Sequence, residues 1–338
     1  MRIAIVNDTP MILESLKRII ISSSQHEIAW LAENGKIATE VCAHDTPDLI
    51  LMDLIMPIMD GAEASKIIMQ HSPCAILVVT SSVEGNASLV FNAMGSGALD
   101  AVNTPVLNPE HPDYSADNLL RKIGVIEKLI RPNITIPKQT ETSSIKRTNK
   151  SKDAMLLAIG SSTGGPAALV TLLSALPSDF DAAIVIVQHI DQQFCLGLIE
   201  WIDEQIHLPV TMAKNGEAPM EGHVYVSAGD QHLTLDVNGK FTYSHEPVSY
   251  PYQPSVNEFF NSVATHWQGD AYGVLLTGMG KDGAVGLLAM KQKGYPTIAQ
   301  DEESCAVYGM PKAAAKLNAA KYVLPLVDIS SQLLKDIN

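Results

Sequence analysis

The sequence predicts an α/β protein of two domains, each built around a doubly wound, mostly parallel sheet. Short apolar segments alternate with helical patterns along most of the 338 residues, and this alternation is typical of parallel strand pairing. A polar stretch interrupts the alternation once, at 132–152. We therefore expect one domain at 1–131, a linker at 132–152 and a second domain at 153–338, each of ordinary domain size.

The first domain contains apolar segments that we interpret as strands, at 2–6, 28–32, 49–52, 75–79 and 99–102. Helical patterns lie between them. In the 11–21 segment the apolar side chains recur with helical spacing, and a final helix near 116–130 completes the domain.

The stretch at 132–152 changes in composition. It begins with Pro132 and Pro137, continues with polar residues and then carries basic side chains, including Lys146 and Arg147. Almost no apolar residue is available there to form a core, so we interpret it as a linker. Its basic cluster is expected to be part of a solvated tether rather than a binding patch.

The alternation resumes after the linker, with strand segments at 155–159, 182–188, 210–213, 224–227, 272–277 and 296–299. Two further segments, 233–236 and 241–244, flank an Asn238-Gly239 pair, which is a strong hairpin signal. We therefore expect the second domain to add a β-hairpin to a mostly parallel α/β sheet.

Charge, hydropathy and cysteine spacing argue against several functions. The net charge is −14 at pH 7, so no basic surface is available in bulk for nucleic acid or an anionic membrane. No apolar run reaches the ~18–20 residues that cross a bilayer, and Asn7 and Asp8 interrupt the first apolar segment too early for a signal peptide. The 4 cysteines lack the spacing of a zinc site or disulfide framework. We expect a cytoplasmic protein with reduced thiols.

Three oxygen-bearing side chains follow strands of the first domain: Asp8 after the first, Asp53 after the third and Thr80 after the fourth. The carboxyl ends of parallel strands gather at one edge of the sheet, where ligands bind. Two carboxylates there suit a hard cation such as Mg²⁺, which would neutralise a phosphoryl group carried by one of them. The alternative is that these residues are capping and surface carboxylates.

The segment 52–61, Met-Asp-Leu-Ile-Met-Pro-Ile-Met-Asp-Gly, resembles the receiver domain of bacterial response regulators, and the resemblance extends over most of the first domain. It implies a flavodoxin-like (βα)5 fold in which Asp53 is the phosphoacceptor. It also implies that Asp8, Asp53 and the backbone carbonyl of Ile55 are ligands of Mg²⁺, and that Thr80 is the switch hydroxyl.

Two positions depart from the usual receiver pattern. Receivers usually carry two acidic residues after the first strand, where this chain has Asn7-Asp8. They also usually carry a Lys before the Pro that follows the fifth strand, where this chain has Thr104 before Pro105. The missing ammonium group would have held a phosphoryl oxygen, and one carboxylate fewer lowers the affinity for metal. We therefore expect phosphorylation of Asp53 to be slow or only weakly dependent on Mg²⁺.

The most informative stretch of the second domain is 159–166, Ile-Gly-Ser-Ser-Thr-Gly-Gly-Pro, which follows an apolar strand segment. A strand that ends at such a sequence and then enters a helix exposes a hydroxyl group near helix N–H groups. The turn could bind a phosphate or present a nucleophilic serine. A P-loop is disfavoured because no Gly-Lys-Ser/Thr follows, and the dinucleotide fingerprint fits poorly as well.

Reactive side chains follow three strand segments of the second domain: Ser162, His189 and Asp282. If these strands are parallel, the three side chains reach the same edge of the sheet. That is the arrangement for acyl transfer, in which a hydroxyl attacks, an imidazole moves the proton and a carboxylate orients the imidazole. Considered alone, His189 is more typical of a structural histidine, and Asp282 could be the N-cap of a helix at 284–291. Their joint placement favours catalysis.

Three segments look like the catalytic motifs of CheB, the chemotaxis protein-glutamate methylesterase family. They are 159–165, the Val-Gln-His at 187–189 and the Leu-Thr-Gly-Met-Gly-Lys-Asp-Gly-Ala at 276–284. A receiver, a linker and this domain cover essentially the whole chain. The resemblance implies hydrolysis of glutamate methyl esters on chemoreceptors with release of methanol, and in many members deamidation of receptor glutamines.

The CheB resemblance also implies a role for each reactive residue. Ser162 is the expected nucleophile, with Ser161 as its nearest competitor. His189 is the expected base, Asp282 its orienting acid, and the backbone N–H of Met279 part of the oxyanion hole. One such donor is typically worth about 2.7–4 kcal/mol in the transition state. No metal is expected in the ester chemistry.

The expected partners follow from the same resemblance: the cytoplasmic helices of methyl-accepting chemoreceptors and a chemotaxis-type histidine kinase, with no nucleic acid and no insertion into the membrane. Asn7-Asp8-Thr9-Pro10 and Asn103-Thr104-Pro105 look like the Wsp-type branch of the family, which serves surface-sensing pathways. Two other functions stay open: a non-enzymatic regulator whose second domain binds a partner, and a serine hydrolase for small esters or lipids.

Overall fold

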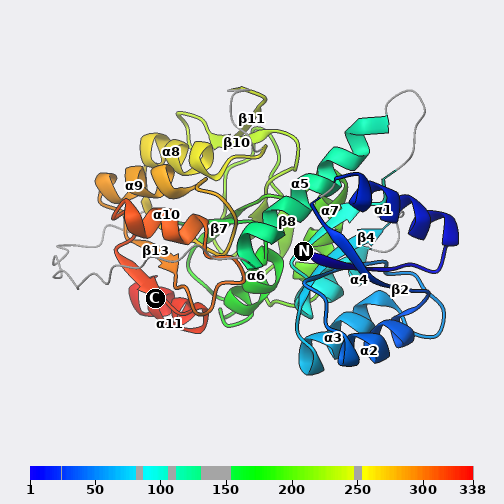
Figure 1. Ribbon diagram of the computed structural model, residues 1–338. Coiled ribbons are helices and arrows are strands. Elements are labelled where there is room, and N and C mark those ends of the chain that lie inside the picture. The colour runs from blue at the N-terminus through cyan, green and yellow to red at the C-terminus, as the bar shows by residue number, and fades with distance from the viewer. Residues whose placement is uncertain (24, 81–86, 106–111, 131–153, 247–252, 338) are drawn as a thin grey trace.

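The computed structural model describes residues 1–23, 25–80, 87–105, 112–130, 154–246 and 253–337. It has two α/β domains that lie side by side, the first in blue to blue-green and the second in green to red (Figure 1). The predicted fold class is confirmed for both domains. The predicted linker at 132–152 lies outside the described residues.

The first domain is a five-stranded parallel sheet in the flavodoxin-like order β2-β1-β3-β4-β5. Its strands are β1 (Arg2–Val6), β2 (Glu27–Ala32), β3 (Leu49–Met52), β4 (Ala75–Thr80) and β5 (Asp100–Asn103). Its helices are α1 (Pro10–Ser22), α2 (Gly35–His44), α3 (Gly61–His71), α4 (Ala87–Gly95) and α5 (Pro112–Ile130).

Helices cover both faces of this sheet, which explains why its strands are uninterrupted apolar runs. Ile3 and Ile5 point to the face covered by α1 and α5, whereas Ala4 and Val6 point to the face covered by α2, α3 and α4. Every residue of β3 is buried. Because side chains alternate along a strand, a strand buried on both faces leaves no position for a polar residue.

The second domain is a seven-stranded sheet in the order β14-β13-β12-β6-β7-β9-β8, with parallel pairing throughout the described register. Its strands are β6 (Met155–Ser161), β7 (Ala183–Gln188), β8 (Val210–Met212), β9 (Val224–Val226), β12 (Asp270–Leu275), β13 (Thr297–Gln300) and β14 (Tyr322–Leu324). The predicted hairpin is present as a separate antiparallel pair, β10 (His232–Leu235) and β11 (Phe241–Ser244).

The helices of the second domain also divide between the two faces of its sheet. One face packs against α6 (Gly165–Leu173), α7 (Gln192–Asp203) and α11 (Leu326–Ile337). The other packs against α8 (Val256–His266), α9 (Ala284–Lys293) and α10 (Met310–Lys316), with the hairpin beside α8. The central strands β6 and β12 are therefore covered on both sides, and their carboxyl ends form the edge where the candidate site lies.

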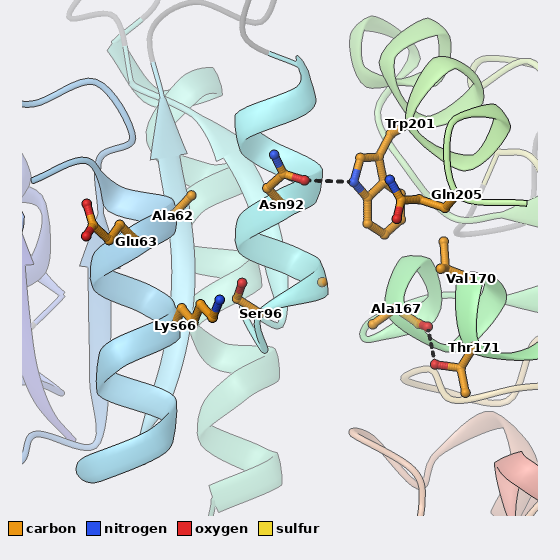
Figure 2. A pocket seen from close by; sticks show the side chains of 11 residues that line it. Ala62, Glu63, Lys66, Asn92, Ser96, Ala167, Val170, Thr171, Trp201 and Gln205 are labelled. Atoms are coloured by element: carbon orange, nitrogen blue, oxygen red, sulfur yellow. Dashed lines mark hydrogen bonds between the residues drawn. The ribbon is translucent and has the colours of Figure 1, made fainter. Parts of the chain in front are cut away.

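The two domains share one hydrophobic core, because the apolar cluster on the α4 side of the first domain continues into α6 and α7 of the second. Trp201 of α7 is the central side chain of this contact. Its ring centroid lies 5.7 Å from that of Phe91, and its indole N–H donates to the side-chain oxygen of Asn92 at 3.0 Å. Figure 2 shows this bond between α4 and α7.

A cavity of about 570 Å³ lies beside this contact. Its lining comes from both domains and includes Lys66 of α3 and Ser96 after α4, with Thr171 of α6 and Gln205 after α7 on the opposite side (Figure 2). Movement of the first domain relative to the second would change this lining.

Several boundaries differ from the predicted ones. The strand predicted at 272–277 is Asp270–Leu275. It ends before Thr277, because the N–H of Thr277 donates to the side-chain oxygen of Gln300 at 2.8 Å rather than to a neighbouring strand. The strand predicted at 99–102 is Asp100–Asn103, and the helix predicted near 116–130 begins at Pro112. Strand β14 was not predicted, since it is a three-residue edge strand with no fully buried residue.

Candidate functional site

Ser162 follows the last residue of β6, at the carboxyl edge of the second sheet. Its N–H donates to the carbonyl of Thr277 at 3.0 Å, so the turn is attached to the segment that follows β12. The chain then passes through Gly164, whose φ of 76° is in the left-handed region, where glycine has no steric penalty. Helix α6 begins at the next residue.

Gln188 holds this turn in place through its side-chain amide. Its NH2 group donates to the carbonyl of Ser162 at 2.9 Å and to that of His189 at 3.0 Å. Its carbonyl oxygen accepts from the hydroxyl of Ser161 at 2.6 Å. A Cβ atom at Gly165 would lie 2.1 Å from that same oxygen, which is the physical reason for glycine there. Ser161 is fully buried in this network, and Ser162, which begins the turn, is 9% exposed.

His189 is the residue after β7, directly beside Ser162. Strands β6 and β7 are parallel, with Ser161 opposite Gln188, so the residues that follow them are neighbours. The N–H of His189 donates to the carbonyl of Ser161 at 3.0 Å. The two sequence-predicted residues are therefore brought together by strand register alone.

Asp282 completes the group through a 2.8 Å contact between its Oδ2 atom and Nε2 of His189. It is not the N-cap of α9, which is Gly283. Burial by itself raises the pKa of Asp282, but the bond and charge interaction with His189 and the amides of Val256 and Asn257 outweigh it and hold that pKa below its usual value. The carboxylate is thus an ionised acceptor that orients the imidazole.

Met279 lies in the loop after β12, next to the serine turn. A Cβ atom at Gly278 would lie 2.7 Å from Cβ of Ser162, so glycine allows this loop to approach the hydroxyl. The carbonyl of Gly278 is occupied by the amides of Gly309 and Met310. Among the described residues the amide of Met279 donates no hydrogen bond, which agrees with its expected place in an oxyanion hole.

Little of this site is exposed in the structure. The side chain of His189 is 9% exposed and that of Asp282 4%. The first domain contacts the serine turn directly, because the carbonyl of Leu99, just before β5, accepts from the N–H of Gly164 at 3.1 Å. The arrangement of the domains is therefore one in which a macromolecular substrate has little access to Ser162.

Asp53 lies at the carboxyl edge of the first sheet, directly after β3. One carboxylate oxygen accepts from the N–H of Leu54 at 2.7 Å and the other from the side-chain amide of Asn7 at 2.8 Å. Burial and the negative charge of Asp8 raise the pKa of Asp53 to about 6, although the amides of Leu54 and Ile55 act in the opposite direction.

The donor set around Asp53 fits a magnesium ion, although it carries few charges. Asp8 is exposed beside the buried Asp53, and the backbone amide of Ile55 lies close to the same carboxylate. In the described part of the chain no group of three His, Cys, Asp or Glu side chains is suited to a metal. Mg²⁺ retains several waters and needs only one or two carboxylates together with phosphate oxygens, so these residues suffice.

The two departures from the receiver pattern are visible in the structure. Asn7 is 1% exposed and donates to Asp53 where a second acid would repel it. The N–H of Thr104 donates to the carbonyl of Thr80 at 2.9 Å, and within the described ranges the buried hydroxyls of these two threonines have no partner. The buried ammonium of Lys122 bonds to Asp100 and Ala101 near the start of β5, so it does not replace the missing lysine.

Sequence reasoning did not identify the roles of Gln188 or of Ser255, whose hydroxyl donates to Asp282 at 3.0 Å. Gln188 belongs to a motif that the sequence contains, and its position before His189 was a usable signal. Ser255 is 27 residues from Asp282 in the chain, and nothing local indicates that the two side chains meet.

One parallel sheet carries a buried carboxylate at its edge, and the other carries a serine–histidine–aspartate group. The two domains share a common core. This combination defines a response regulator with an enzymatic output domain. Comparison with known proteins narrows this class. The family model described as CheB methylesterase matches residues 157–333, and that described as Response regulator receiver domain matches residues 3–111. The chain belongs to the CheB methylesterase family.

Two relatives are similar to nearly the whole chain. Protein-glutamate methylesterase/protein-glutamine glutaminase 3 of Pseudomonas aeruginosa is 49% identical over 338 residues, covering 98% of both chains. Protein-glutamate methylesterase/protein-glutamine glutaminase 2 of Cupriavidus metallidurans is 50% identical over 334 residues, covering 99% of this chain and 98% of its own. The crystal structure of the Thermotoga maritima CheB methylesterase catalytic domain is 36% identical, with a TM-score of 0.51, and covers 54% of this chain and 98% of that one.

Proposed function

We propose that this chain hydrolyses glutamate methyl esters on chemoreceptors and that phosphorylation of Asp53 controls the reaction. The observation that carries the proposal is the 2.8 Å bond between His189 and Asp282 at the strand edge where Ser162 begins its turn. Membership of the CheB methylesterase family and the names of the relatives support an enzyme over a regulator without activity.

In the first half of the reaction, the hydroxyl of Ser162 attacks the ester carbonyl. Nε2 of His189 is engaged by Asp282, so Nδ1 is the ring nitrogen that takes the serine proton. The N–H of Met279 stabilises the negative oxygen of the tetrahedral intermediate. The carbon–oxygen bond to the methoxy group then breaks, and the proton on His189 leaves with it as methanol.

In the second half, a water molecule attacks the acyl-enzyme. His189 takes a proton from the water and returns it to Ser162, which restores the enzyme and leaves a glutamate side chain. The same sequence on a glutamine side chain would release ammonia in place of methanol. We include deamidation in the proposal because the relatives are named as glutaminases as well.

The receiver domain is proposed to accept a phosphoryl group on Asp53 from a chemotaxis-type histidine kinase. When bound, Mg²⁺ neutralises charge on the phosphoryl group. Asp8, Asp53 and the carbonyl of Ile55 are the groups that would hold it, and the hydroxyl of Thr80 is the candidate switch. Asn7 supplies an amide donor in place of a third charge, which supports slow or weakly Mg²⁺-dependent phosphorylation.

Control is proposed to act through the contact between the domains. With α4 on α7 and Leu99 bonded to Gly164, the receiver restricts access to Ser162. Phosphorylation would shift the population toward an arrangement in which this contact is broken, by an amount set by the differential contacts of the two states.

The proposed substrate is the cytoplasmic part of a methyl-accepting receptor, and the proposed location of the protein is the cytoplasm. None of the described helices is long and apolar enough to cross a bilayer. A place in the Wsp-type, surface-sensing branch remains part of the proposal, based on the segments that contain Asn7 and Thr104.

The test is methanol release from a methylated receptor fragment in the presence of a small phosphodonor. Wild type is expected to release methanol and Ser162→Ala only the background amount. Ser161→Ala is the matched control, because it removes the neighbouring hydroxyl, which bonds to Gln188 and takes no part in the proposed reaction. It is expected to lose far less activity than Ser162→Ala. Equal release by wild type and Ser162→Ala would contradict the proposal, and hydrolysis of small chromogenic esters without receptor would favour a general esterase.

A further inference from the structure

Asp282 is held at the beginning of helix α8 by three donors in addition to His189. Its Oδ1 atom accepts from the hydroxyl of Ser255 at 3.0 Å and from the N–H of Asn257 at 3.1 Å. Its Oδ2 atom accepts from the N–H of Val256 at 2.7 Å and faces Nε2 of His189 at 2.8 Å. The carboxylate therefore occupies the positive end of a helix dipole, with each oxygen making two hydrogen bonds.

Ser255 has two functions in this arrangement, and their directions are defined by the partners. As the N-cap of α8, its oxygen accepts from the N–H of Glu258 at 3.4 Å. Its O–H donates to Asp282, which as a carboxylate can only accept. Ser255 is fully buried, so water does not compete for either bond.

Ser255 is itself fixed by a buried histidine of the hairpin. The N–H of Ser255 donates to Nδ1 of His232 at 3.0 Å, and His232 is fully buried at the start of β10. Because Nδ1 accepts, the ring is neutral with its proton on Nε2. A second contact between hairpin and helix, from the N–H of Leu235 to the hydroxyl of Ser262 at 2.9 Å, holds α8 at the same place.

We propose that Ser255 is a positioning residue of the hydrolytic site, whose hydroxyl donates to Asp282 and so sets the orientation of the carboxylate toward His189. This inference rests on the proposed function and adds a residue to its machinery. The low pKa of Asp282 agrees with it, since donors to the ionised form favour that form.

The two functions of Ser255 can be separated by substitution. Aspartate is as good an N-cap as serine, but it cannot donate and places a second negative charge against Asp282. Threonine retains both the cap and the donor. If Ser255 acted only as the cap, any effect of Ser255→Asp would appear in thermal unfolding and leave kcat unchanged. The proposed role predicts a fall in kcat that Ser255→Thr does not share.

The experiment measures kcat and KM for methanol release by the full chain in wild type, Ser255→Thr and Ser255→Asp, with thermal unfolding of each. For Ser255→Asp we expect kcat to fall about 10- to 100-fold, as for loss of a hydrogen bond to a charged group, with KM within about twofold of wild type. Ser255→Thr is expected to remain within about threefold of wild type. An unchanged kcat in Ser255→Asp, or a loss of kcat in Ser255→Thr that equals it, would overturn the proposal.

A second measurement separates this inference from the choice of substrate. A fluorophosphonate probe reacts with an activated serine whatever its natural ester, and mass spectrometry locates the label. We expect slower labelling of Ser162 in Ser255→Asp than in wild type and Ser255→Thr. If wild type is labelled but releases no methanol, the proposed substrate is wrong and the labelling rates still decide the role of Ser255. If the three proteins are labelled equally, or wild type not at all, the positioning role is wrong.

Discussion

At the scale of single residues, Asn7 places an uncharged amide against Asp53, the proposed phosphoacceptor. It is buried, its NH2 group donates to Asp53 at 2.8 Å, and its carbonyl oxygen accepts from the N–H of Thr9 at 2.8 Å. A carboxylate in that place would repel Asp53 unless a cation lay between them. Asn7 therefore holds the Asp53 carboxylate by a hydrogen bond and adds no negative charge to the site.

This arrangement leads to a prediction for Asn7→Asp. The half-saturating Mg²⁺ concentration for labelling of Asp53 by a small phosphodonor should fall roughly 5- to 10-fold, because one added charge near a divalent cation is worth about 1 kcal/mol or more even in water. The measurement is the labelling rate over a range of Mg²⁺ concentrations. Asn238→Asp, at an exposed turn position, makes the same change in charge and should leave the Mg²⁺ dependence as it is.

Asp282 predicts a pH dependence of stability. Its folded pKa lies below the value of about 3.9 for an unfolded aspartate, so its contribution to stability is fully present above that value and is lost as the pH falls through the folded pKa. In urea unfolding, the free-energy difference between wild type and Asp282→Asn should be constant at higher pH and shrink below about pH 4. The exposed Asp179→Asn serves as control, and a difference that grows on acidification would contradict the assignment.

At the scale of elements, the contact of α4 with α7 is close enough to be sensitive to small changes in volume. Gly95 ends α4, and a Cβ atom there would lie 3.1 Å from the ring of Trp201. This close approach lets Trp201 reach both Phe91 and Asn92. The absence of a side chain at one helix position thus allows the domains to close.

We predict that Gly95→Leu raises methanol release in the absence of a phosphodonor. Overpacking destabilises a contact of this kind by about 1–3 kcal/mol. The population of molecules in which the two domains have separated would therefore rise by about fivefold or more. The matched control is Gly124→Leu in α5, because a Cβ atom at Gly124 meets nothing within 4 Å, and its basal activity should equal that of wild type. Unchanged basal activity in Gly95→Leu would mean that this contact does not limit access.

For the whole molecule, the continuous core across the two domains is the feature that couples them. Residues of α4 and α7 belong to the same apolar cluster, and the backbone bond from Gly164 to Leu99 connects the receiver to the turn that presents Ser162. Opening this contact exposes apolar surface, which opposes it by about 25 cal/mol per Å². Under the proposed control, this cost would keep the open population small in the resting state.

Hydrogen exchange offers a test of this coupling. With a phosphodonor and Mg²⁺, the amides of α7 and the amide of Gly164 should exchange faster, because the contact that shields them is broken in the open population. The control is Asp53→Asn, which removes the proposed phosphoacceptor and should exchange at the same rate with and without the phosphodonor. Full labelling of Asp53 without any change in exchange at Gly164 would exclude this route of control.

The sequence by itself determined the fold class and most of the elements, because their signals are local. The central strands β3, β6 and β7 are continuous apolar runs. The Asn238-Gly239 pair marks the hairpin, and the φ of Gly239, 73°, lies in the left-handed region that favours glycine. The placement of Ser162, His189 and Asp282 at one edge of the sheet was also predictable, since each follows a strand. Edge strand β14 was not, because three half-exposed residues carry no periodic signal.

Only the tertiary structure decided which groups meet. His189 and Asp282 are 93 residues apart in the chain, and their bond depends on the pairing of β6 with both β7 and β12. Packing between distant segments also decides three other contacts. They are those of Ser255 with Asp282, of Gln188 with the serine turn and of Trp201 with the first domain. Side-chain spacing along a chain sets its strands and helices, whereas the order of those strands in a sheet sets the chemistry at its edge.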